Sequence, residues 1–150
     1  MLNKDFKDIL QLLLEENVDF LLVGGYAMGA HGYPRATKDI DIWVWADMAN
    51  SKKVFSTLAK FGAPMDNVSP SDFSDAGVIF QIGVPPNRVD IITDLSGVDF
   101  KTCRGNRIVV SIDGLDVPVI GRADLIANKR ALGRPQGLVD ADILKNESRQ

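Results

Sequence analysis

The sequence predicts an α/β fold of the α+β kind, in which a mixed β-sheet is flanked by helices and two further helices close the chain. In the first half, apolar runs alternate with amphipathic segments, and in the second half two pairs of β-branched runs are joined by turn-forming residues. The chain has 150 residues, 45% of them hydrophobic, which is enough for one globular core. We therefore expect a single domain over residues 1–150.

The first elements are a helix, a strand and a short helix. Apolar residues recur with helical spacing between positions 6 and 13 and predict an amphipathic helix that ends near residues 16–17. The apolar run 18–23 predicts a strand, and Gly24-Gly25 stops it before a short helix over 26–31. The two glycines are consequently expected at a strand-to-helix turn.

A second strand and a longer helix follow. Residues 39–46 alternate and are rich in Ile, Val and Trp, as is typical of a strand. Either Asn50 or Ser51 is expected to cap the next helix, which ends at Gly62. Residues 64–76 collect Pro, Ser and Asp with little periodicity. This pattern predicts an exposed loop, either a plain connection or a segment that moves over a site.

Two hairpins and two helices complete the prediction. Residues 78–82 and 88–93 flank a Gly- and Pro-containing turn, and residues 107–112 and 115–120 flank Asp-Gly, so each pair is expected to be antiparallel. Two closing helices are expected over 122–132 and 138–144, separated by a Gly-Arg-Pro sequence, and Asp124 suits the positive N-terminal end of the first.

Charge and composition exclude several classes of protein. The formal net charge of −3 gives no broad electropositive surface for nucleic acid. Cys103 is the only cysteine, which excludes an internal disulfide and a cysteine-rich zinc site, and a buried inert thiol is expected. His31 is the only histidine, which excludes a multi-histidine metal site, and we assign it no role. The charged N-terminus predicts neither a signal peptide nor a membrane segment, hence a cytoplasmic protein.

Carboxylates on the second and fourth predicted strands are the candidate catalytic residues. Side chains at i and i+2 of a strand share a face, so Asp39 and Asp41 project together while Ile40 and Ile42 face the core. Asp90 lies in an apolar strand, where a carboxylate requires a partner. If the strands are neighbours, Asp39, Asp41 and Asp90 converge and suit Mg²⁺, which prefers oxygen ligands. The alternative is a pair of exposed carboxylates at a strand edge.

The same cluster has the composition of a two-metal site for phosphate chemistry. Three such carboxylates are able to hold two divalent ions, one activating an attacking hydroxyl and one holding a triphosphate, with Asp90 as metal ligand and general base. Gly24 and Gly25 supply the complementary half, because a glycine turn lets backbone N–H groups approach phosphate oxygens.

Basic and aromatic residues near this cluster admit two interpretations. Arg35 and Lys38 either neutralise triphosphate charge or are surface cations, and Arg35 is the first choice for substrate contact. Trp43 and Trp45 share the parity of Asp39 and Asp41 and either stack on a base or, as the preferred interpretation, pack in the core under the C-terminal helices.

Two spaced motifs carry a family resemblance. Residues 24–28 (GGYAM) with residues 35–41 (RATKDID) resemble the core signature of the DNA polymerase β-like nucleotidyltransferases. The chain is most similar to the abortive-infection and toxin-type branch, because DLIANKR at 124–130, GRPQ at 133–136 and Asp140 resemble its C-terminal block. The first turn departs from the pattern, since it has Gly-Gly where many relatives have Gly-Ser.

The resemblance implies a fold, a reaction and partners. It implies a minimal nucleotidyltransferase fold, two Mg²⁺ ions on Asp39, Asp41 and Asp90, and binding of a nucleoside triphosphate such as ATP. A nucleoside monophosphate would pass to an acceptor hydroxyl on a protein, an RNA end or a small molecule, with release of pyrophosphate. Lys129 would reach the phosphates, unless it pairs with Asp124 or Asp140, which is the preferred interpretation. The toxin-type branch typically works beside a neutralising partner, and a companion protein or a homodimer would then complete the acceptor groove here.

Two other functions fit the same residues. A catalytically silent module of the same fold would bind nucleotide or a partner protein without turnover. A metal-dependent phosphohydrolase also uses clustered aspartates, but it commonly carries the histidines that this chain lacks. We rank the transferase first, the silent module second and the hydrolase third.

Overall fold

The computed structural model describes residues 2–35, 37, 39–84 and 87–147. In this part of the chain, one six-stranded mixed sheet has the order β3-β4-β2-β1-β6-β5. The strands are β1 (Phe20–Val23), β2 (Asp39–Val44), β3 (Ile79–Ile82), β4 (Arg88–Ile92), β5 (Ile108–Ile112) and β6 (Leu115–Val119). The helices are α1 (Lys4–Glu15), α2 (Gly24–Ala30), α3 (Met48–Phe61), α4 (Phe100–Gly105), α5 (Arg122–Leu132) and α6 (Pro135–Glu147), with a 3₁₀ turn, η1 (Asp72–Ser74).

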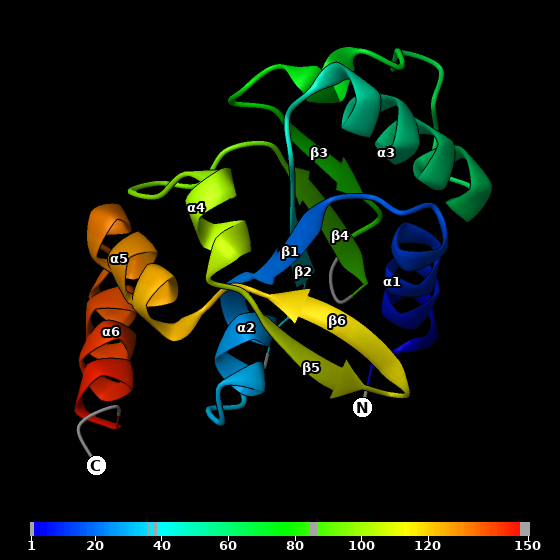
Figure 1. The fold of residues 1–150 in the computed structure, drawn as a ribbon. Helices are drawn as coiled ribbons and strands as arrows, with labels where there is room; N and C mark the ends of the chain where they lie inside the picture. Colours follow the sequence, from blue (N-terminus) through cyan, green and yellow to red (C-terminus); the bar gives the residue numbers. More distant parts are fainter. Residues whose placement is uncertain (1, 36, 38, 85–86, 148–150) are drawn as a thin grey trace.

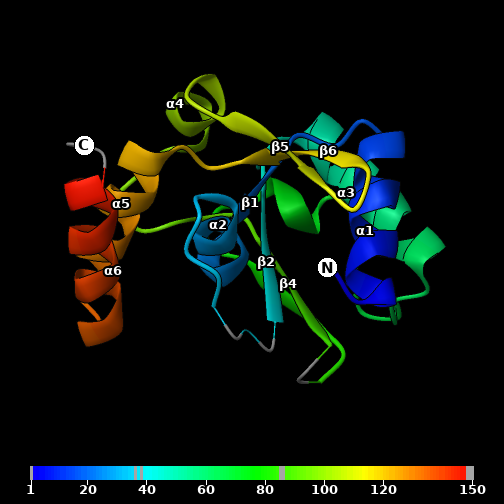
Figure 2. The same cartoon turned by 90° about the horizontal axis from the view of Figure 1, so that it is seen from below.

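Strand pairing confirms the mixed sheet and both hairpins. β3 and β4 are antiparallel, as are β5 and β6. β2 pairs antiparallel with β1 and parallel with β4, and β1 pairs parallel with β6. α1 and α3 lie together on one side of the sheet, and α4, α5 and α6 lie on the other (Figures 1 and 2). The central strand β2 is therefore bounded by helices on both faces.

The core lies between the sheet and the pair α1–α3. The α1 side chains Phe6, Ile9, Leu10 and Leu13 are fully buried, and so are Ile40 and Ile42 of β2. Burial of each such side chain contributes about 1.5–3 kcal/mol. This apolar face orients β2, so that the alternate residues Asp39 and Asp41 project from the opposite face.

The N-cap of α3 is Asp47, so the prediction of Asn50 or Ser51 was wrong. The Asp47 side chain accepts a hydrogen bond from the Asn50 backbone N–H at 2.7 Å. Asn50 is instead buried, and its amide group donates to the carbonyl oxygens of Asp19 and Trp45 at 3.0 and 2.8 Å. Asn and Asp are equally good caps from local sequence, and only the tertiary contacts of Asn50 assign it another task.

The segment 64–76 packs against α3. Ser51 donates to the carbonyl oxygen of Pro70 at 2.8 Å and accepts from the Phe73 N–H at 2.9 Å. Phe73, in η1, is 1% exposed and contacts Phe80 edge to face. The segment is thus largely exposed, as predicted, but it is anchored to α3 through one buried aromatic side chain.

Helix α4 is the element that the sequence pattern did not predict. Its six residues are too few to show a helical repeat, and it begins where Asp99 accepts a hydrogen bond from the Thr102 N–H at 3.0 Å. Phe100 contacts the rings of Trp43 and Trp45, with centroids 5.1 and 5.7 Å apart. The tryptophans therefore pack as expected, with α4 in place of the C-terminal helices as the aromatic partner.

The first closing helix matches its prediction, and the second is longer than predicted at both ends. α5 ends at Gly133, whose φ of +67° lies in the left-handed region. α6 begins at Pro135 and not at residue 138, because proline at the first helical position loses no needed hydrogen bond. None of the helices over the described residues is both long enough and apolar enough to cross a membrane.

Two residues outside the site behave as expected. Cys103 is buried, and this burial, with the negative charge of Asp124, raises the pKa of its thiol to about 12. Such a thiol is unreactive at neutral pH. His31 shares a 2.8 Å hydrogen bond between Nε2 and the Ile120 carbonyl oxygen, which ties α2 to the end of β6.

Candidate active site

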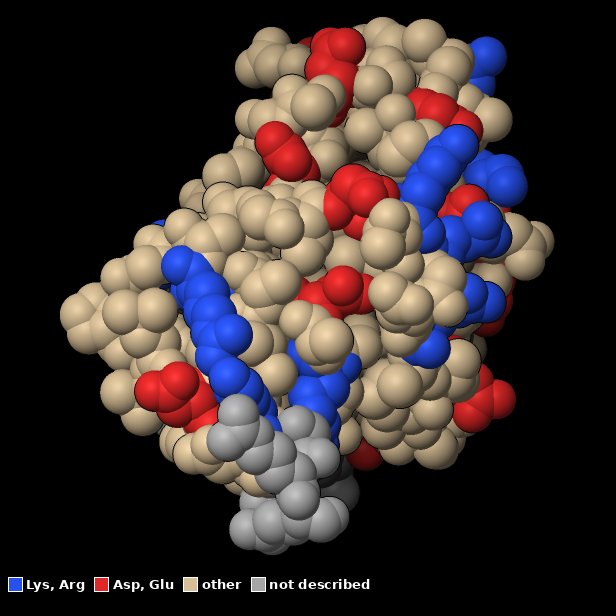
Figure 3. Space-filling model, turned by 60° about the vertical axis from the view of Figure 1, so that its left-hand side comes forward, with Lys and Arg blue, Asp and Glu red and all other residues tan. Residues whose placement is uncertain are grey.

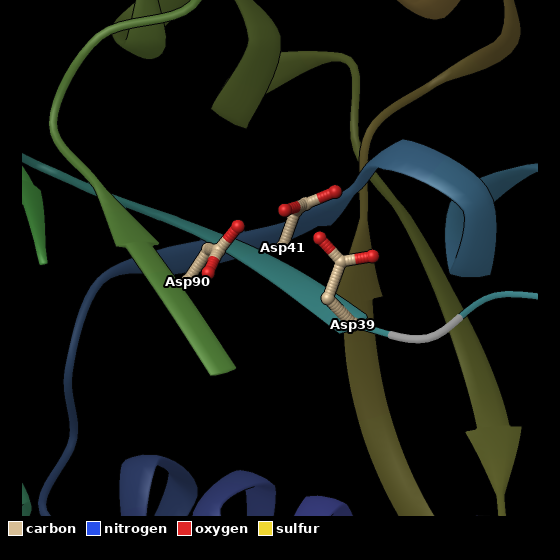
Figure 4. A group of neighbouring side chains, drawn as sticks. All are labelled: Asp39, Asp41 and Asp90. Atoms are coloured by element: carbon tan, nitrogen blue, oxygen red, sulfur yellow. The ribbon is translucent and has the colours of Figure 1, made fainter. Parts of the chain in front are cut away.

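The parallel pairing of β2 with β4 brings the three predicted carboxylates together. Asp41 is the direct partner of Asp90 in the register, and Asp39 lies two residues before Asp41 on the same face. One oxygen from each of Asp39, Asp41 and Asp90 lies within 4.8 Å of the others. Figure 4 shows the three carboxylates pointing toward one another from the two strands. The cluster has the oxygen donors and the spacing that suit a divalent cation.

The surroundings of Asp41 in the cluster raise the pKa of its carboxyl group. Its partial burial, together with the negative charges of Asp39 and Asp90, raises the pKa of Asp41 from 3.8 to about 7, and the charge of Arg88 offsets part of this rise. Asp90 is 7% exposed. Close carboxylates of this kind repel one another, and a bound cation removes the repulsion.

Arg88 is a site residue that the sequence analysis missed. Its Nη2 donates to Asp39 Oδ2 at 2.7 Å and to Asp90 Oδ2 at 3.1 Å, and its Nε donates to Asp90 Oδ1 at 2.9 Å. A signal was present, because Arg88 lies two residues before Asp90 and so shares its face. The contact with Asp39 depends on the pairing of β2 with β4, which sequence parity does not reveal.

The predicted glycine turn lies directly against the cluster. Gly24 begins α2 immediately after β1 and has a φ of +70°. A Cβ atom at this position would collide with Oδ2 of Asp41 and lie 3.1 Å from its Cγ. A Cβ atom at Gly25 would collide with the Thr37 methyl group. At Gly24 the left-handed φ adds to the close approach of Asp41, whereas Gly25 is in close contact with a side chain of the segment before β2.

A pocket of about 310 Å³ opens beside the glycine turn and Asp41. It lies between the end of β4 and the closing helices, and its wall includes Gly24, Gly25, Asp41, Ile92, Leu95, Asn128, Lys129, Leu132 and Arg134. Asn128 donates to the Ser96 carbonyl oxygen at 3.0 Å, which ties α5 to the segment after β4. The pocket thus combines carboxylate, cationic and apolar groups in one wall.

Arg35 and Lys129, two of the predicted nucleotide-binding residues, meet at one buried carboxylate. Arg35 Nη2 donates to Asp140 Oδ1 at 2.6 Å, and Lys129 Nζ donates to Asp140 Oδ2 at 3.3 Å. Burial alone would raise the pKa of Asp140, but hydrogen bonds from Arg35 and Gln136, with the charge of Lys129, lower it overall. The expected pairing of Lys129 with Asp140 is confirmed. Lys38 lies outside the described residues.

Charges on the surface around the closing helices are mixed. Figure 3 shows basic and acidic side chains interspersed over the coloured part of this face, with no continuous basic area. This agrees with the small negative net charge of the chain.

Comparisons with known proteins identify the fold. No family model matches the sequence, and no curated protein matches it. The structure is similar to that of TM1012 of Thermotoga maritima, assigned as a nucleotidyltransferase, with a TM-score of 0.64, 16% identity and coverage of 98% of this chain and 96% of that one. The lincosamide antibiotic adenylyltransferase LnuA, with lincomycin bound, gives a TM-score of 0.62 at 16% identity and covers 97% of both chains.

A third similar structure is the antibiotic-resistance factor ANT(2'')-Ia, with a TM-score of 0.63, 18% identity and coverage of 97% of this chain and 83% of that one. The chain therefore has the nucleotidyltransferase fold, which confirms the predicted fold class. At these identities the likeness concerns the fold, and the chemistry of this chain has to be argued from its own residues.

Proposed function

We propose that this chain is a metal-dependent nucleotidyltransferase that transfers a nucleoside monophosphate from a nucleoside triphosphate to an acceptor hydroxyl and releases pyrophosphate. The observation that carries the proposal is the convergence of Asp39, Asp41 and Asp90 beside a pocket at the Gly24-Gly25 turn. The nucleotidyltransferase fold supports it.

The donor atoms of the cluster fit Mg²⁺. Three carboxylates supply only oxygen ligands, and the Asp41 carboxylate has no ion pair with a Lys or Arg among the described side chains. When bound, the metal would neutralise phosphate charge and lower the pKa of an acceptor hydroxyl. Asp39, Asp41 and Asp90 would hold it, and two ions are expected with a triphosphate.

The remaining groups have distinct tasks in this proposal. The absence of side chains at Gly24 and Gly25 lets phosphates approach the backbone, and Lys129 faces the same pocket. Leu95 and Leu132 supply apolar wall for the nucleoside. Asp90 takes the proton of the attacking hydroxyl on a carboxylate oxygen as the new P–O bond forms and the bond to pyrophosphate breaks.

The acceptor class is proposed from the similar structures. LnuA is an adenylyltransferase of lincosamide antibiotics, and ANT(2'')-Ia was captured with adenylyl-2''-tobramycin. We therefore propose ATP as the first donor to test and a hydroxyl-bearing small molecule as the first acceptor class, ahead of a protein or an RNA end. A toxin-type role, a neutralising partner, a homodimer and a cytoplasmic location stay predictions.

The test uses α-labelled nucleoside triphosphates, Mg²⁺ and a cell extract separated into small molecules, RNA and protein. Asp39→Ala plus Asp41→Ala removes the cluster, and Asp75→Ala plus Asp142→Ala removes two exposed carboxylates elsewhere. Label transferred by wild type and control but not by the cluster variant supports the proposal and identifies the acceptor pool. Equal transfer by all three proteins, or Mg²⁺-independent transfer, contradicts it.

One observation favours a second candidate, the silent binding module. Arg88 already neutralises part of the cluster through its contacts with Asp39 and Asp90. If that arrangement persisted with nucleotide present, the chain would bind a triphosphate without turnover. Binding of nucleotide with no transfer to any fraction would select this function.

A further inference from the structure

Arg88 lies among the carboxylates that are proposed to hold the metal. It contacts both oxygens of Asp90 and one oxygen of Asp39, while its own side chain is 29% exposed. The guanidinium is thus partly accessible, and its hydrogen bonds go to Asp39 Oδ2 and to both oxygens of Asp90. A single positive charge here faces three acidic side chains, so the cluster remains acidic overall.

A purely structural arginine would be expected to hold carboxylates that have no other task. Arg35, in contrast, pairs with Asp140, which lies outside the carboxylate cluster. The partners of Arg88 are instead the proposed metal ligands. A cation on those oxygens would remove the charge that attracts the guanidinium and would repel it.

We propose that Arg88 is a partner-exchanging residue: it balances Asp39 and Asp90 while the metal is absent, and it binds the triphosphate once they are engaged by metal. The proposal rests on the proposed function. A guanidinium fits it chemically, because its planar fork binds carboxylate and phosphate oxygens with the same geometry. The pocket at the glycine turn includes Asp41 in its wall, and Asp41 is the register partner of Asp90, which Arg88 contacts. A triphosphate in this pocket would therefore lie beside the cluster.

This role predicts two effects of opposite sign. Removing the Arg88 charge should tighten binding of the metal alone, because the guanidinium no longer competes for Asp39 and Asp90. The same change should weaken binding of the metal–triphosphate complex, because one phosphate ligand is lost. A merely structural role would weaken both or change neither.

The experiment measures Mn²⁺ and Mg²⁺ binding by calorimetry, alone and with a non-hydrolysable ATP analogue, for wild type, Arg88→Gln, Arg88→Lys and Arg104→Gln. Arg104 is a matched control, since it pairs with Asp19 away from the cluster. For Arg88→Gln we expect roughly three- to tenfold tighter metal binding and roughly tenfold weaker analogue binding. Arg88→Lys should lie between, and Arg104→Gln should match wild type.

Changes of the same sign in Arg88→Gln, or no change, would overturn the inference while leaving the proposed function standing. Wild type that binds neither metal nor analogue would overturn both. If Arg88→Gln does not fold, the Nε–H NMR signal of Arg88 in wild type replaces it as the readout. That signal should shift when Mg²⁺ is added and shift again with the analogue, and an unchanged signal refutes the exchange.

Discussion

Gly24 and Asp41 lie so close that position 24 has no room for a Cβ atom. The glycine begins α2, and the carboxylate belongs to the neighbouring strand β2. The contact couples the glycine turn that is proposed to bind phosphate to a proposed metal ligand. Any side chain at position 24 would displace Asp41.

Gly24→Ala should therefore damage both stability and metal binding. The left-handed φ and the collision with Asp41 Oδ2 are expected to cost about 1–3 kcal/mol of unfolding free energy. Metal affinity should fall because Asp41 is pushed out of place. Urea unfolding and calorimetry measure the two effects. Gly29→Ala in the same helix is the control, since its nearest neighbour, the Pro34 Cα, would be 3.8 Å away. Equal behaviour of the two variants would contradict the prediction.

Asp41→Asn should stabilise the metal-free protein, and more so at high pH. The pKa of Asp41 is raised from 3.8 to about 7 in the folded state, so the folded protein holds this proton more tightly than the unfolded chain. That contribution is present at low pH and is lost as pH rises from about 4 through 7. We expect the variant to gain about 1–3 kcal/mol over wild type at pH 8 and little near pH 4. A pH series of denaturant melts in chelator checks this, and a gain that grew toward low pH would refute it.

Metal binding should weaken as pH falls through about 7. Mg²⁺ requires the ionised Asp41 carboxylate, whose pKa of about 7 makes the proton a competitor below that value. The expected loss approaches tenfold for each pH unit once Asp41 is mostly protonated. Mn²⁺ titrations between pH 5.5 and 8.5 measure this, with Asp41→Asn as a pH-independent, weaker-binding reference. An affinity that is constant over this range would be inconsistent with Asp41 as a ligand.

Asp140→Asn should weaken nucleotide binding and destabilise the fold. The variant leaves Arg35 and Lys129 without the buried charge that holds them, and loss of one partner from a buried ion pair costs about 3–5 kcal/mol. Partial exposure of Arg35 places the expected loss at the lower end. Asp142→Asn is the matched control, because its contact with Arg130 at 3.9 Å is exposed. Thermal melts and analogue titrations that show no difference between the two variants would exclude this role.

Local patterns predicted the parts of the site that depend on one strand at a time. Alternation along β2 placed Asp39 and Asp41 together, opposite the buried Ile40 and Ile42, and the structure agrees. The position of Asp90 between Val89 and Ile91 marked it as a candidate, because burial of an unpartnered charge is costly. These inferences needed only the two-residue repeat of a strand and the cost of burying a charge, both of which are local.

Features that join distant segments were beyond those patterns. Helix α4 has too few residues to show a repeat, and its place is decided by contacts of Phe100 with Trp43 and Trp45. Asn50 was predicted as a cap because its local sequence suits one, but its amide group is used instead to hold Asp19 and Trp45. In both cases, packing between segments far apart in the chain decided the outcome.

By itself, the sequence determined which side chains share a face and where the chain turns, because these follow from backbone geometry over a few residues. Only the tertiary structure decided that β4 lies parallel to β2 in the register that sets Asp90 opposite Asp41 and Arg88 opposite Asp39. Strand order and register depend on the burial of whole sheet faces against α1 and α3, a free energy summed over residues that no local window contains.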